Sequence, residues 1–131
     1  MKSLISVDVG SNGITKNLAT LFHLVASSDL SALSIGNYEQ SNKNRFTSNS
    51  DCHSDSAKCT HGHVSQALQA LTAMLSQNNA LSLLNFKDVG LGNQGLEAIK
   101  RAKATQLVSL NLNQNSITNV TSSTFADMVN L

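Results

Sequence analysis

Residues 107–117 read LVSLNLNQNSI, with leucines at the first, fourth and sixth positions, an asparagine at the ninth and an isoleucine at the eleventh. The same pattern of apolar residues starts again at Leu4, Leu30 and Leu81. Leu4 and Leu30 are 26 positions apart, as are Leu81 and Leu107, whereas Leu30 and Leu81 are separated by 51. A motif that recurs at a fixed interval predicts stacked structural repeats, here with an insertion in the second one.

The spacing inside each unit predicts a short strand followed by a helix. Leu110 and Leu112 are two positions apart, so their side chains point to the same face of a strand. Between residues 18 and 25 the apolar residues fall at the spacing of a helix, and the same spacing recurs over residues 64–75 and, more briefly, near 96–99. One strand and one helix cannot bury their apolar sides alone, which predicts that neighbouring units stack.

The pattern L-x-x-L-x-L-x-x-N-x-L resembles the leucine-rich repeat family over nearly the whole chain. The helix-bearing units, and residues 85–96 in particular, resemble its ribonuclease-inhibitor-like subclass, while the last unit is similar to shorter repeats with little regular helix. The resemblance implies an α/β fold, a solenoid with short parallel strands on its concave side and helices on its convex side. It also implies one domain over residues 1–131, with repeats near 4–29, 30–80, 81–106 and 107–131.

The ninth position of the pattern departs from the family in two units. Its asparagine normally lies inside and hydrogen-bonds backbone groups of the turn. Asn12 and Asn115 fit that role, whereas Tyr38 and Val89 stand in its place in the two middle units. The middle turns are therefore expected to satisfy their backbone in another way.

Neither end of the chain carries a polar cap of the kind that solenoids usually need. The first unit starts three residues after Met1, and Leu131 resembles the first leucine of a further repeat. We expect either a piece of a larger protein or a chain that covers its ends with another copy.

Composition narrows the class of partner. Only 13% of the residues are charged and the formal net charge is +1, which suggests neither a nucleic-acid nor a membrane partner. No apolar run is long enough to cross a membrane, and no secretory core stands at the start. Two cysteines are too few for a disulfide framework, which favours a cytoplasmic location.

In the family that the chain resembles, partner proteins dock on the concave sheet. The resemblance therefore predicts a protein-interaction scaffold with no catalysis and no cofactor, binding a partner whose identity the sequence does not give. No aromatic or arginine residue, the usual anchors of an interface, stands in the concave columns. The candidate partner-binding residues are Asp8, Ser34, Leu83, Asn85, Lys87, Ser109, Asn111 and Asn113.

The insertion offers a second hypothesis, a metal-binding or redox-sensitive regulatory module. Residues 39–62 are polar, with Phe46 as nearly their only apolar residue, and are expected to form a disordered loop. Thiolates and imidazoles are preferred zinc ligands, although the spacings here depart from the usual ones, and the two cysteines can pair only in an oxidising compartment. The weak candidate ligands are Cys52, Cys59, His61 and His63.

A nucleotide-binding enzyme is a remote third hypothesis. Gly90, Gly92 and Gly95 spell G-x-G-x-x-G between a predicted strand and a predicted helix, but the repeat itself explains this turn. Residues 7–12 resemble the first phosphate loop of actin-like ATPases, but the expected continuation of that fold is missing. No catalytic set emerges elsewhere in the sequence.

Overall fold

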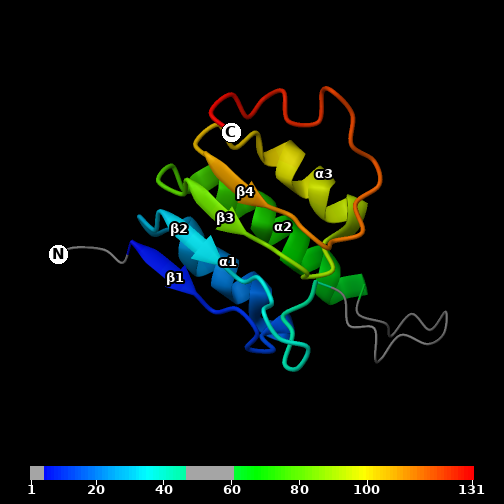
Figure 1. Cartoon of the computed structure of the whole chain (residues 1–131). Helices are drawn as coiled ribbons and strands as arrows, with labels where there is room; N and C mark the ends of the chain where they lie inside the picture. Colours follow the sequence, from blue (N-terminus) through cyan, green and yellow to red (C-terminus); the bar gives the residue numbers. More distant parts are fainter. Residues whose placement is uncertain (1–4, 47–60) are drawn as a thin grey trace.

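The computed structural model describes residues 5–46 and 61–131, and shows a parallel sheet with helices packed on one of its faces (Figure 1). The four strands lie in sequence order, β1-β2-β3-β4, and each pair is parallel. The predicted α/β class is therefore confirmed. The strands are β1 (Ser6–Asp8), β2 (Ala32–Ser34), β3 (Leu83–Asn85) and β4 (Ser109–Asn111).

A helical segment follows each of the first three strands. The helices are α1 (Leu18–Ala26), which a short 3-10 turn (Thr15–Asn17) precedes, α2 (His61–Gln77) and α3 (Gly92–Ala102). After β4, the described residues form turns without a helix, as the sequence of the last unit predicts. No helix within residues 5–46 and 61–131 is both long and apolar enough to cross a membrane.

The predicted strand faces are confirmed, because the central residues of the strands pair with one another and point toward the helices. Leu33 pairs with Leu84, and both are at most 1% exposed. Their counterparts in the two end strands, Val7 and Leu110, are only half-buried because each has a neighbouring strand on one side. The core is thus deepest between β2 and β3.

Three phenylalanines hold the centre of the core together. Phe22 of α1 stacks on both Phe46 and Phe86, with ring centroids 5.8 Å apart in each case. Phe46 and Phe86 are also 5.8 Å apart. Aromatic pairs at this distance add stabilisation to the burial of their area.

The turns after the strands repeat one backbone conformation on both sides of the ninth position. A left-handed residue precedes it in three units, and another follows it. Residues other than glycine rarely adopt a positive φ, so its recurrence shows that the turns are built alike. The preceding residues are Ser11, Asp88 and Gln114, and the following residues are Gly13, Gly90 and Ser116.

The ninth-position asparagine of the last unit lies inside, as expected. Asn115 is 2% exposed, its Nδ2 donates to the Phe86 carbonyl over 2.7 Å, and its Oδ1 accepts from the N–H groups of Val89 and Leu91 at 3.0 Å each. It therefore satisfies the turn of the unit before its own.

The same expectation for Asn12 is wrong. Its side chain is exposed, and among the described residues Nδ2 donates only to the Gly10 carbonyl of its own turn. The contacts of Asn115 explain the difference. An asparagine at this position hydrogen-bonds the unit before its own, and no strand precedes β1 in the part of the chain that the structure describes.

The second unit recovers its asparagine after a detour of the chain. Asn44 is fully buried, donates through Nδ2 to the carbonyls of Val9 and Ile35, and accepts from the Ile14 N–H. These contacts match those of Asn115 two units further along. Tyr38 therefore does not take the asparagine position of the turn. Asn44, six positions further along the chain, takes it instead.

The predicted insertion at 39–62 is accordingly too long at both ends. Phe46 is 3% exposed within the core, and its N–H donates to the Val89 carbonyl over 2.8 Å. At the other end, α2 already begins at His61. The remainder, residues 47–60, lies outside the described residues.

Candidate functional site

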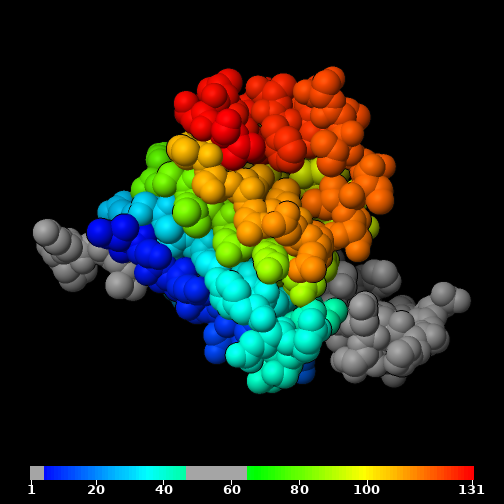
Figure 2. Space-filling model, in the orientation of Figure 1, coloured from blue at the N-terminus to red at the C-terminus, as the bar shows by residue number. Residues whose placement is uncertain are grey.

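Figure 2 is a view onto the face of the sheet that carries no helix. The predicted partner-binding residues lie on the four strands of this sheet or in the turns after them. Strand register places Leu83 beside Ser109, and Asp8, Ser34, Asn85 and Asn111 in one row across all four strands. Lys87 and Asn113 follow two residues after β3 and β4 end. The pleat alternates side chains between the two faces, and it therefore brings these eight residues to one surface.

Three residues of that row have a structural function in addition to their exposure. Asp8 Oδ1 accepts from the Gly10 N–H over 2.9 Å, and Asn85 and Asn111 do the same for the N–H two residues ahead of them, at 3.1 and 3.0 Å. Each side chain thus closes the turn at the end of its strand. Among residues 5–46 and 61–131, neither Asn85 Nδ2 nor Asn111 Nδ2 has an acceptor.

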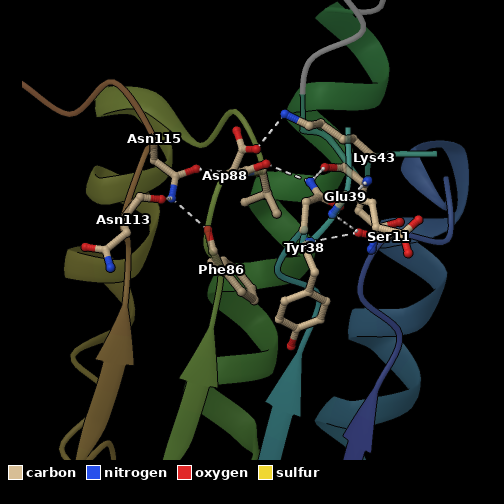
Figure 3. A network of polar contacts seen from close by, with 11 residues as sticks. Ser11, Tyr38, Glu39, Lys43, Phe86, Asp88, Asn113 and Asn115 are labelled. Atoms are coloured by element: carbon tan, nitrogen blue, oxygen red, sulfur yellow. Dashed lines mark hydrogen bonds and ion pairs between the residues drawn. The ribbon is translucent and has the colours of Figure 1, made fainter. Parts of the chain in front are cut away.

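Tyr38 is the functional candidate that sequence reasoning missed. Its hydroxyl donates to Asp8 Oδ2 over 3.1 Å and lies 3.1 Å from Ser34 Oγ. Figure 3 shows the ring lying across the outer face of the sheet. The side chain is 59% exposed, so an aromatic ring with a fixed hydroxyl stands on a surface that the sequence predicts to have no anchor.

Glycine at position 10 makes this placement of the ring feasible. A Cβ on Gly10 would lie 2.6 Å from Tyr38 Cε2 and would also collide with the Gly36 carbonyl oxygen. Gly36 likewise leaves room for the Asn85 amide, whose Oδ1 would lie 2.8 Å from a Cβ there. The two glycines therefore let the side chains of neighbouring strands lie flat against the sheet.

The loop that carries Tyr38 is fastened to the units on both sides of it (Figure 3). Toward the first unit, Ser11 Oγ accepts from the N–H groups of Tyr38 and Glu39 at 2.9 and 3.2 Å. Toward the third unit, Lys43 Nζ lies 2.6 Å from Asp88 Oδ2 and forms a partly buried ion pair. The ring is thus held by the loop as well as by its own hydroxyl.

Opposite charges stand at the two sides of the face. Asp8 lies on β1, the first strand, and Lys87 follows β3. Neither forms an ion pair within the described parts of the chain, where the two salt bridges are Lys43–Asp88 and Glu97–Lys100. Leu83, 41% exposed, adds an apolar contact surface on β3, in the row of Ala32 and Ser109.

Two backbone donors in the glycine-rich loop of the nucleotide hypothesis are occupied. The N–H of Leu91 donates to Asn115 Oδ1 and that of Gly92 to the Asn115 carbonyl, at 3.0 and 2.9 Å. Gly95 has a packing role, because a Cβ there would collide with the Leu91 side chain. The backbone groups that hold phosphate in such loops are used here by the next repeat.

The metal hypothesis falls mostly outside the structure. Cys52 and Cys59 lie in residues 47–60, and His61 and His63 stand in the first turn of α2. Within the described ranges no group of three or more histidine, cysteine, aspartate or glutamate side chains could hold a metal ion.

Comparison with known proteins adds no relative. No protein-family model matches the chain, and no curated protein or solved structure gives a significant match.

Proposed function

We propose that the chain is a leucine-rich repeat solenoid that binds a segment of another protein on the outer face of its sheet, without catalysis. The observation that carries this proposal is the Tyr38 ring, which is exposed on that face and whose hydroxyl hydrogen-bonds Asp8 and Ser34. A side chain that is already ordered loses little entropy when a partner packs on it. Tyrosine is also among the residues in which interface binding energy concentrates.

The rest of the face supports the same role. The Nδ2 groups of Asn85 and Asn111 are donors without an acceptor in the described structure, and the Lys87 ammonium adds a charge beside them. A partner's carbonyl or carboxylate oxygens can accept from these groups. Leu83 and the Tyr38 ring supply apolar contact area next to them.

Selection from a random peptide display library against the folded chain tests this function. We expect the selected peptides to perturb backbone NMR signals of the four strands and of residues 37–46, and to bind Tyr38→Ala at least about tenfold more weakly. Thr20→Ala is the matched control, because Thr20 is exposed on α1, on the opposite side of the molecule. Peptides that bind both variants equally and perturb only helix signals would contradict the proposal.

A further inference from the structure

A rule links the ninth-position asparagines to their neighbours in the structure. Asn44 and Asn115 each enter the turn of the preceding unit, where the amide donates to the carbonyl of the sixth position. The amide oxygen of each accepts the N–H of the eleventh position, Ile14 or Leu91. Each such asparagine therefore needs a unit before it, and each turn needs a unit after it.

Asn12 has no preceding unit to bond among the described residues. It occupies the ninth position of the first unit, is exposed, and donates only to the Gly10 carbonyl. Its amide oxygen accepts no hydrogen bond from residues 5–46 or 61–131. An amide in the position of Asn44 and Asn115 is thus left facing outward at the β1 end.

The turn after β4 receives no asparagine from a following unit among the described residues. In the third unit the N–H groups of the sixth, ninth and eleventh positions all donate to the fourth unit. In the fourth unit these positions are Leu112, Asn115 and Ile117, and no acceptor for their N–H groups stands among the described residues. Three backbone N–H groups at the β4 end are therefore without an acceptor in the described structure, in the place where an asparagine of a following unit would bond them.

The apolar side chains of the two ends show the same incompleteness. At the fourth, sixth and eleventh positions of the pattern, the residues of the second and third units are at most 4% exposed, while those of the first and fourth units are only half-buried. Burial of such side chains stabilises by about 25 cal/mol per Å² of apolar area. The half-buried residues are Val7, Val9 and Ile14 at the β1 end and Leu110, Leu112 and Ile117 at the β4 end.

We propose that the β1 end of one copy of this chain docks on the β4 end of a second copy. The β1 strand then joins the sheet of the second copy as a parallel fifth strand. Asn12 enters the turn at 112–117, its Nδ2 donating to the Leu112 carbonyl and its Oδ1 accepting from Asn115 and Ile117. The two contacting surfaces differ, so the association is head to tail and does not close after two copies. This surface is separate from the face that carries Tyr38.

Sedimentation velocity of the 131-residue chain over a concentration series tests the proposal. We expect the mean mass to rise with concentration through dimers to longer chains. Asn12→Ala is expected to weaken the association about tenfold or more, because it removes several hydrogen bonds at once. Asn119→Ala, the control, removes an exposed amide without a side-chain partner in the described structure and is expected to leave the association unchanged. A monomer at every concentration would overturn the proposal.

Mixing two blocked variants tests the direction of docking. Asn12→Lys places a charge at the β1 end, and Ile117→Lys places one at the β4 end; circular dichroism establishes that both are folded. Each variant alone is expected to be monomeric, and an equimolar mixture to form a dimer and nothing larger, since one compatible pair of ends remains. Dimers of Asn12→Lys by itself would mean that β4 ends pair with each other, which overturns head-to-tail docking.

Discussion

Asn44 Nδ2 donates to the carbonyl of Val9 over 2.9 Å, across 35 positions of the chain. The contact joins the loop of the second unit to the residue that follows β1 and restores the repeat after an insertion. The geometry of the turn, and not a fixed spacing in the sequence, therefore determines which residue hydrogen-bonds the preceding unit.

Asn44→Ala is expected to lower the free energy of unfolding by about 2–4 kcal/mol, because buried backbone groups of both units lose their partners. Urea unfolding followed by circular dichroism measures the change. Asn12→Ala is the matched control at the same repeat position, and its cost in the monomer is expected to stay below about 0.5 kcal/mol because the side chain is exposed. Equal costs would mean that the burial of Asn44 contributes nothing.

Two adjacent residues of β3 test the assignment of the strand faces. Leu84 is 1% exposed and Leu83 is 41% exposed, so they point to opposite sides of the sheet. Leu84→Ala is expected to cost about 2–5 kcal/mol as a core truncation. Leu83→Ala is expected to cost less than about 1 kcal/mol in the same unfolding experiment. The reverse order would show that the faces are exchanged.

The fluorescence of the chain reports on Tyr38 alone, because the sequence holds one tyrosine and no tryptophan. Gly10→Ala introduces a methyl group where the ring lies, so we expect the ring to leave the sheet and acrylamide quenching to increase. In Gly13→Ala the nearest atom to the new methyl is 3.8 Å away. That control adds the backbone strain of a positive φ, which Gly10 does not have, and should still leave quenching unchanged.

The Lys43–Asp88 pair is expected to stabilise the loop that carries Tyr38. Asp88 has a positive φ, which asparagine tolerates, so Asp88→Asn removes the charge with little backbone strain. We expect a loss of about 1 kcal/mol, because Lys43 is only 11% exposed in its side chain and keeps an unpaired charge. Glu97→Gln breaks an exposed pair on α3 and is expected to change stability by less than about 0.5 kcal/mol. Similar effects of the two substitutions in thermal unfolding would argue against this difference.

The strand residues of the candidate site were predictable from the sequence. The alternation of Leu84 between Leu83 and Asn85 predicts which side chains leave the core, and the structure places them as expected. The dual role of Asn85, which closes its own turn through Oδ1, has a local signal too, since a short amide often bonds the backbone two residues ahead. The Tyr38 anchor has no such signal.

The strands, their inward residues and the helices were predictable from the chain alone, because strand and helix periodicities are local properties, whereas the parallel order of the strands was implied by the resemblance to leucine-rich repeats. Two features emerge only from the three-dimensional structure: Asn44 takes the turn position in place of Tyr38, and the Tyr38 ring lies on the outer face of the sheet. Both depend on partners far away in the sequence: Val9 for Asn44, and Asp8 for Tyr38. A spacing rule cannot contain such contacts, because the length of the intervening loop changes the spacing while the hydrogen-bonding groups that must be satisfied remain the same.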